Sequence, residues 1–430
     1  MVCYGALRMP LALLELPLYV VLPALYGDAG LSLAMVGLVL FAARCIDACA
    51  DPLIGLALAR RGRFVHRRWI LSACPLLAGG FWALLHPPNS GATSLAIWLG
   101  GCSILTYLAY SLASIAYQSW GTDLGEDAGA RARVTAWREA FGLSGVLLGT
   151  LFLEPSQRDA LALTLLGLTG VSAALLMRAP SPPMATAPLP RPERDREAAQ
   201  DRGPTKPAVS EPNPSAWTRV LNNRPFRRLL LVFLINGTAA AIPATLLLFF
   251  VRDVLHAQSL TPVFLAAYFF AGALAMPLWV LLARAIGLRL AWLAGMGLAV
   301  AGFAWTLGLS AGDANAFTGV CIVTGLALGA DLALPGAFLA QVIADGGDRG
   351  ATSGAYVGLW NLTSKASLAL AAGLALPLLH WAGYEPGQPE GELALSLSYG
   401  ALPCALKLVA SALLGLIPPQ TTPLNRLHAA

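Results

Sequence analysis

The stretch Arg44-Cys-Ile-Asp47-Ala-Cys-Ala-Asp51-Pro52 places two carboxylates inside an apolar run, residues 32–58, that otherwise has the composition of a membrane-spanning helix. Asp47 and Asp51 are four residues apart, so a helix puts them on one face, about one turn from each other. A carboxylate near the bilayer centre costs about 2.5–3.5 kcal/mol on insertion scales, so the pair requires a compensating cation, proton or partner. Lys365, in the run WNLTSKASLALAAG, is a further intramembrane charge. Together these residues predict a cation-driven transporter.

The composition is that of a membrane protein with many spans. Of the 430 residues, 57% are hydrophobic and 12% are charged, and the mean hydropathy is +0.66. Soluble domains carry about 25% charged residues. The net charge of +5 does not indicate nucleic-acid binding, because the basic residues are spread over short loops. We therefore expect a protein of the lipid bilayer with no nucleic-acid partner, and we expect it to be a monomer. The first apolar segment lacks a signal-peptide cleavage site, so we expect it to be retained as the first helix.

Twelve segments are long and apolar enough to span a bilayer, which requires about 20 residues. They fall near 9–27, 32–58, 69–86, 93–120, 137–154, 159–178, 229–251, 260–284, 289–311, 315–344, 350–382 and 395–417. Residues 179–228 are rich in proline and charge and predict a linker. We predict an all-α membrane protein of the major facilitator superfamily fold, with six-helix bundles at 1–178 and 229–430 joined by a cytoplasmic linker.

The placement of arginine predicts the orientation. The loop after the second predicted helix and the linker are rich in arginine, whereas the loops on the other side carry almost none. By the positive-inside rule, both termini and the linker face the cytoplasm. We expect the protein to lie in the inner (cytoplasmic) membrane.

Three blocks of sequence resemble one transporter family. They are RCIDACADPLIGLALARRGR (44–63), YSLASIAYQSWGTDLGEDAGARARVTAWREAFG (110–142) and GAYVGLWNLTSKASLALAAGLALPLLHWAGY (354–384). These blocks resemble the glycoside-pentoside-hexuronide:cation symporters, the melibiose-permease branch of the superfamily. The resemblance implies symport by alternating access, with Asp47 and Asp51 as the cation site, Lys365 beside it and Arg138 lining the central cavity.

The paired carboxylates permit two kinds of driving ion. They hold a hard cation through oxygen ligands, or they share a proton. Sodium-using relatives place asparagine where this chain has Ala50, which favours a proton. We expect no cofactor, no catalytic residue and no metal beyond possible Na⁺ at Asp47 and Asp51. The structural alternative is a static ion network, either Arg44 with Asp47 or Lys365 with an acid.

The sugar-binding residues of the family are absent. Its two sugar-binding acids correspond here to the apolar run Pro10-Leu11-Ala12 and to Ser114, and its stacking aromatic corresponds to Gln118. A simple galactoside is therefore not the expected substrate. We expect a small organic solute or, as a branch of the family moves lysophospholipids, an amphiphile such as a lysolipid or fatty acid.

Other polar residues in the apolar segments are candidates for substrate binding or coupling. Glu15 is either a relocated ligand or proton site or a paired carboxylate, and Asp331 either contacts substrate or pairs with Lys365. The candidate set for substrate binding or coupling is Lys365, Arg138, Glu15, Ser114, Gln118, Asp331 and Asn361.

The loop after residue 54 resembles the superfamily's GxxxDRxGR gating motif. Its matching residues are Gly55, Arg60, Gly62 and Arg63, with Ala59 in place of the acid. The same arginines also act as simple topology determinants. No HxxxH, HExxH or serine-elbow pattern predicts an enzyme, and no filter sequence predicts a channel. A non-transporting scaffold or sensor stays an alternative, although unused intramembrane charges are costly to keep.

Overall fold

Long helices make up almost all of the part of the chain that the computed structural model describes, which is residues 2–61, 66–89, 91–123, 138, 141–142, 144–152, 157–178, 219–345, 353–388 and 391–416. The first half contains α1 (Val2–Gly5), α2 (Arg8–Asp28), α3 (Leu33–Arg61), α4 (His66–Leu85), α5 (Ala92–Asp123), the short η2 (Thr150–Phe152) and α7 (Arg158–Arg178). The second half contains α10 (Arg224–Phe249), η4 (Phe250–Val254), η5 (Gln258–Leu260), α11 (Thr261–Ile286), α12 (Leu288–Trp305), η6 (Thr306–Gly308), α13 (Ala314–Asp345), α14 (Ser353–Trp381), α15 (Glu392–Ser396), η7 (Leu397–Ala401) and α16 (Leu402–Gly415).

Eleven helices of the described part are long and apolar enough to cross a membrane. They coincide with eleven of the twelve predicted spans, which confirms the predicted all-α membrane fold class. The predicted span at 137–154 lies largely outside the described residues. The predicted linker at 179–228 also lies outside them up to residue 218.

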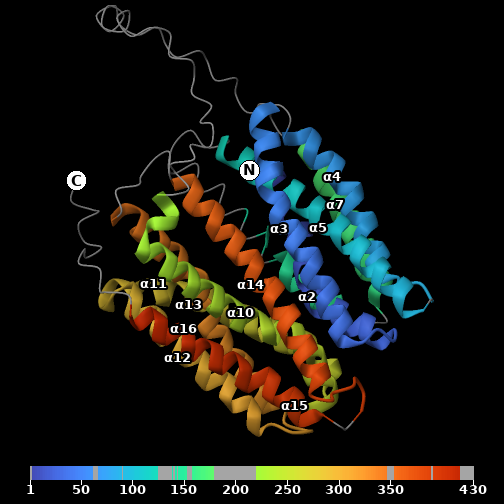
Figure 1. Cartoon of the computed structure of the whole chain (residues 1–430). Helices are drawn as coiled ribbons and strands as arrows, with labels where there is room; N and C mark the ends of the chain where they lie inside the picture. Colours follow the sequence, from blue (N-terminus) through green and yellow to red (C-terminus); the bar gives the residue numbers. More distant parts are fainter. Residues whose placement is uncertain are drawn as a thin grey trace, which may run out of the picture.

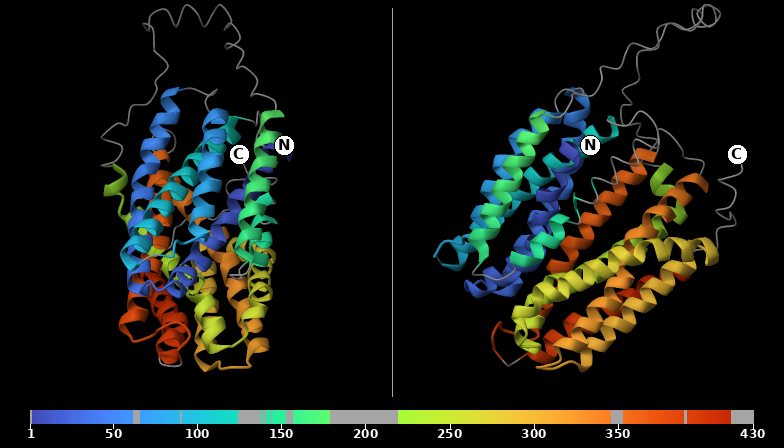
Figure 2. Two further views of the ribbon diagram at one scale, coloured as in Figure 1. Left: turned by 90° about the vertical axis from the view of Figure 1, so that its right-hand side faces the viewer. Right: turned by 180° about the vertical axis from the view of Figure 1, so that it is seen from behind.

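The helices form two groups that meet along α2, α3, α10 and α14. Helices α2 to α7 lie on one side and α10 to α16 on the other (Figure 1). We call the end of the molecule where α7 ends and α10 begins the linker end, and the opposite end, where α2 ends, the distal end. The two groups lie farther apart at the linker end than at the distal end (Figure 2).

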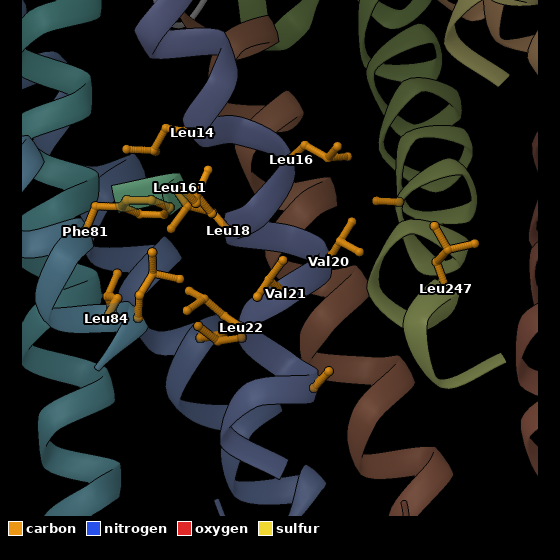
Figure 3. Close-up of a cluster of buried hydrophobic side chains, with 14 of the residues drawn as sticks. Leu14, Leu16, Leu18, Val20, Val21, Leu22, Phe81, Leu84, Leu161 and Leu247 are labelled. Atoms are coloured by element: carbon orange, nitrogen blue, oxygen red, sulfur yellow. The ribbon is translucent and has the colours of Figure 1, made fainter. Parts of the chain in front are cut away.

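Helix α2 is the centre of the packing because it is apolar on all sides. Such a helix is stable only when it is covered all round, and most of its residues are buried. Figure 3 shows Leu14 and Leu18 directed towards Phe81 of α4, whereas Leu16 is directed towards Leu247 of α10. Helix α2 therefore contacts both halves of the chain.

Helices α3 and α14, from opposite halves, cross at very short range. A Cβ atom on Gly37 would lie 2.7 Å from the carbonyl oxygen of Ala372 and 2.9 Å from Cδ of Pro377. A Cβ atom on Gly373 would lie 2.9 Å from the ring of Phe41. Small residues permit such close helix contacts in membranes. This crossing sets α3 directly against α14, the two helices that carry the predicted cation site.

Candidate functional site

The three residues predicted to form the driving-ion site are in direct contact. Lys365 Nζ on α14 lies 2.9 Å from Asp47 Oδ2 and 2.6 Å from Asp51 Oδ2, both on α3. Lys365 also donates to Ser111 Oγ on α5 at 2.7 Å, and Ser111 donates to Asp47 Oδ1 at 2.6 Å. We call these four residues the acid–lysine cluster; it joins the two halves of the protein.

The acid–lysine cluster has excess negative charge and one unsatisfied oxygen. Its two carboxylates face one ammonium group, which leaves a net charge of −1 when all three groups are ionised. Asp47 is only 1% exposed, whereas the side chains of Asp51 and Lys365 are 22% and 20% exposed. Asp51 Oδ1 is buried and has no hydrogen-bond partner among the described residues. A buried acceptor without a partner costs about 1–3 kcal/mol, so this oxygen favours a proton or a cation.

Arg44 does not pair with the acids. Its guanidinium group lies over the rings of Tyr107 and Tyr19, 3.8 Å and 4.5 Å from their centroids. Such cation–π contacts stabilise a desolvated arginine. Of the two static pairings considered from the sequence, Arg44 lies within electrostatic range of Asp47 without a direct ion pair, whereas Lys365 forms ion pairs with both acids.

Glu15 belongs to a second polar group, on α2 and α5, which we call the Arg8 triad. Arg8 Nη1 lies 2.7 Å from Glu15 Oε1 and donates to the hydroxyl of Tyr110 at 3.3 Å. Tyr110 in turn donates to the same oxygen of Glu15. Glu15 is thus a paired carboxylate, while its side chain stays 31% exposed.

The remaining predicted substrate residues are only loosely grouped. Gln118 is exposed and donates to Ser114 at 3.0 Å. Arg138 is half-buried and lies within electrostatic range of Tyr117, as does Arg8. Asn361 is exposed on α14. Gly55 and Arg60 lie in α3, and Gly62 and Arg63 of the predicted gating loop lie outside the described residues.

Asp331 pairs with Lys407, which corrects the expected pairing with Lys365. Lys407 Nζ on α16 lies 2.9 Å from Asp331 Oδ2 on α13 and 2.9 Å from Asn236 Oδ1 on α10. Asn236 and Trp292 each donate to Asp331 Oδ1 at 2.9 Å. Lys407 lies closer because α16 packs directly on α10, whereas Lys365 faces the other half of the protein. This cluster of four helices lies entirely in the second half.

An apolar cavity of about 60 Å³ borders α2 and the second half of the chain. Leu16 is its wall on α2, and α10 contributes Ala240, Pro243, Ala244 and Leu247. The other walls come from α11, α12, α13 and η7, and their hydroxyls are those of Tyr268, Thr324 and Tyr399. Its apolar lining suits the apolar part of an organic ligand.

An ion pair joins the two halves at the distal end. Arg252 Nη1 on η4 lies 2.9 Å from Asp28 Oδ1 at the end of α2, and Arg252 Nε donates to Asp253 Oδ1 at 2.8 Å. Asp253 accepts further bonds from the Tyr384 hydroxyl and from the Gly387 amide. Burial and the bond to Asp253 raise the pKa of Tyr384, so this residue remains a neutral donor. The network holds the halves together at this end.

Breaking the distal ion pair should favour opening of the distal end. Exposed ion pairs contribute about 0.2–1 kcal/mol, so Asp28→Ala or Arg252→Ala should raise the ratio of open to closed molecules about 1.4- to 5-fold. Spin labels at Ala29 and Ser259 would report the opening as a population of longer label-to-label distances in double electron–electron resonance measurements. The same change at the exposed Asp159 serves as control, and an unaltered distance distribution in both variants would contradict the role of the pair.

Sequence reasoning missed several residues of these clusters. Lys407 carried a usable signal, because it is a lysine in the apolar run ALPCALKLVASALLG and intramembrane charge is functional or paired. Arg8 and Tyr110 carried a weak one, since arginine close to a predicted helix end is ordinary. Ser111 carried none, because a serine in a membrane helix has several satisfactory local partners.

Solved structures share this fold over nearly the whole chain. The nucleoside transporter NupG aligns with a TM-score of 0.69 at 11% identity, covering 96% of this chain and 98% of its own. A bacterial homologue of the human lysosomal transporter Spinster gives 0.68 at 14% identity, with 97% and 94% covered. A bacterial homologue of the iron transporter ferroportin gives 0.67 at 14%, with 96% of each chain covered. The chain therefore shares the fold of these three transporters.

The family is shown by the sequence itself. The profile of the family described as MFS/sugar transport protein matches residues 3–419, so the chain belongs to this family. The match confirms the melibiose-permease-like resemblance of the three sequence blocks. No curated protein matches the chain. The protein is thus a multi-pass membrane transporter and not an enzyme.

Proposed function

We propose that the protein is a cation-coupled symporter that moves a small organic solute by alternating access. The observation that carries this proposal is the acid–lysine cluster, in which Lys365 of one half forms ion pairs with both Asp47 and Asp51 of the other. Intramembrane carboxylates with a net negative charge and an unsatisfied oxygen are suited to binding a driving ion. We place the protein in the inner membrane, with both termini and the linker end towards the cytoplasm.

The Lys365 ammonium acts in this proposal as an internal substitute for the driving ion. Lys365 pairs with the two carboxylates when no driving ion is bound, and it is displaced when a proton or Na⁺ binds to them. Lys365 and the acids lie on opposite halves, so loading the site weakens one contact between the halves. A ligand shifts a conformational equilibrium only through such differential contacts. Coupling between ion and bundle movement follows from this geometry.

The proposed driving ion is the proton. Sodium requires several oxygen ligands, and the described residues around Lys365 offer those of Asp47, Asp51 and Ser111. Ala50 adds no side-chain oxygen at the place where sodium-using relatives have asparagine. A proton needs only one carboxylate oxygen, and Asp51 Oδ1 is buried without a partner.

A second candidate function is transport of an amphiphile such as a lysolipid or fatty acid. The apolar cavity favours it, because a space lined by apolar and aromatic side chains suits an acyl chain better than a sugar. Sugar recognition requires several converging polar groups, and the three hydroxyls of the cavity do not supply carboxylate acceptors.

A stabilisation screen tests the proposed substrate class. Melibiose should leave the thermal midpoint of the purified protein unchanged, whereas lysophosphatidylcholine or decanoate should raise it. Ala244→Trp should remove the response by filling the cavity, and Ala301→Trp on the exposed face of α12 is the matched control. A midpoint raised by melibiose alone would overturn the amphiphile proposal. Repeating the screen with and without sodium tests the choice of ion.

A further inference from the structure

Among the residues that the structure describes, Arg8 uses only one of its three side-chain nitrogen atoms. Both of its hydrogen bonds, to Glu15 and to Tyr110, are donated by Nη1. The Nε–Nη2 edge donates no hydrogen bond to any residue in the described ranges. This edge is the fork that binds a carboxylate or phosphate with two parallel bonds. The Arg8 side chain is 24% exposed, so a solute reaches it.

The space beside this edge is kept open by a glycine. A Cβ atom on Gly142 would lie 3.1 Å from Arg8 Cγ and 3.3 Å from Nε. Any larger side chain there would press on the arginine at the edge that lacks partners. Gly142 therefore leaves room beside Nε that an alanine would fill.

The charges around Arg8 favour an anion at that edge. Glu15 is the one carboxylate that bonds Arg8 within the described ranges, and Tyr110 donates to the same Glu15 oxygen, which disperses its charge. An arginine held by one partly neutralised carboxylate at one edge is a site for an oxyanion.

We infer that the Nε–Nη2 edge of Arg8 binds an anionic group of the transported solute, a carboxylate or a phosphate ester. The inference rests on the proposed transport function and names its substrate class as an organic anion. Glu15 keeps Arg8 oriented and charge-paired while the site is empty. Leu16, the next residue, belongs to the wall of the apolar cavity, so α2 borders both the anion site and a space for an apolar body.

Equilibrium binding to the full-length purified protein tests the site without any ion gradient. The probes are decanoate and dodecyl phosphate, each compared with its neutral counterpart, methyl decanoate and dodecanol. The wild type should bind at least one of the two anions more tightly than the neutral counterpart of that anion. Binding of only the carboxylate or only the phosphate identifies which oxyanion the site accepts. Equal binding of anionic and neutral partners would overturn the inference.

Variants of the triad separate recognition from folding. Arg8→Gln should weaken anion binding about 10- to 100-fold, the range expected for loss of charge-assisted hydrogen bonds. Gly142→Ala should weaken it as well, by crowding Nε. Glu15→Gln should strengthen it, because it removes the competing charge and keeps an acceptor for Nη1. A merely structural triad predicts no gain from Glu15→Gln, so unchanged or weaker binding in that variant would count against the site.

The same variants distinguish this inference from the proposed function. Asp159→Asn, at an exposed aspartate that belongs to neither cluster, should bind the anionic probes like the wild type. If anions bind through Arg8 but ion gradients drive no uptake, the symport proposal fails and the anion site stands. If gradients drive uptake but Arg8→Gln binds the probes normally, the anion site fails and the symport proposal stands.

Discussion

Asn in place of Asp51 should abolish accumulation driven by an ion gradient while leaving exchange of the solute intact. The substitution changes the net charge of the acid–lysine cluster from −1 to zero, because Asp47 and Lys365 then form a neutral pair. A neutral cluster has no charge to attract a driving ion, and Lys365 is no longer displaced. Bundle movement with bound solute does not require the ion step, so exchange continues.

Proteoliposomes with an imposed proton or sodium gradient measure both activities. Accumulation of the compound that stabilises the protein in the screen reports coupling, and counterflow of the same compound without a gradient reports exchange. Asp159→Asn, at an exposed aspartate of the distal end, controls for the chemistry of the change. Gradient-driven accumulation at the wild-type level in Asp51→Asn would sink the assignment of the driving-ion site.

Simple sequence rules predict the positions of the membrane-spanning helices and the placement of Asp47 and Asp51 on one helix face. Apolar runs of about 20 residues locate the spans, since every backbone polar group in lipid requires an internal partner. The four-residue spacing of Asp47 and Asp51 puts both acids on one face. Their contact with Lys365 was not derivable from spacing, because it depends on how two distant helices cross. The resemblance to the family supplied it.

Contacts between distant helices were the part that sequence rules did not predict. Asp331 was expected to meet Lys365 or the solute, yet its partner is Lys407, the buried lysine that the same rule on intramembrane charge identifies. The order of helices around the second half decides between the two lysines, and a single sequence does not contain that order. Ser111 shows a second limit of sequence reasoning. A serine in a membrane helix is not energetically unusual, so only its neighbours in the folded protein show that it belongs to the acid–lysine cluster.

The two lysine clusters differ in a way that separates coupling from structure. The acid–lysine cluster joins both halves, is partly exposed and contains an unsatisfied carboxylate oxygen. In the Lys407 cluster, Asp331 and Asn236 are bonded on each side and the lysine is 1% exposed. Fully satisfied buried networks make a core rigid. We therefore assign the Lys407 cluster to the stability of the second half and not to ion movement.

Lys407→Ala should accordingly cause the largest loss of stability of any single change in the protein's charged clusters. It leaves the Asp331 carboxylate, whose side chain is only 13% exposed, without a cation, a defect that costs up to about 3–5 kcal/mol. It also leaves a void between α10, α13 and α16. The free energy of unfolding in detergent, measured by denaturant titration with tryptophan fluorescence, should fall by roughly this amount.

The double variant Lys407→Met with Asp331→Asn distinguishes an uncompensated charge from lost packing. Methionine restores most of the buried volume, and asparagine still accepts hydrogen bonds from Asn236 and Trp292 without carrying a charge. Because exchanging both members of a buried ion pair for neutral residues is often close to neutral in stability, the double variant should recover most of the loss. It should also retain gradient-driven uptake, since the driving-ion site is untouched. Recovery of stability with loss of coupling would instead make Asp331 and Lys407 a second ion-coupling site.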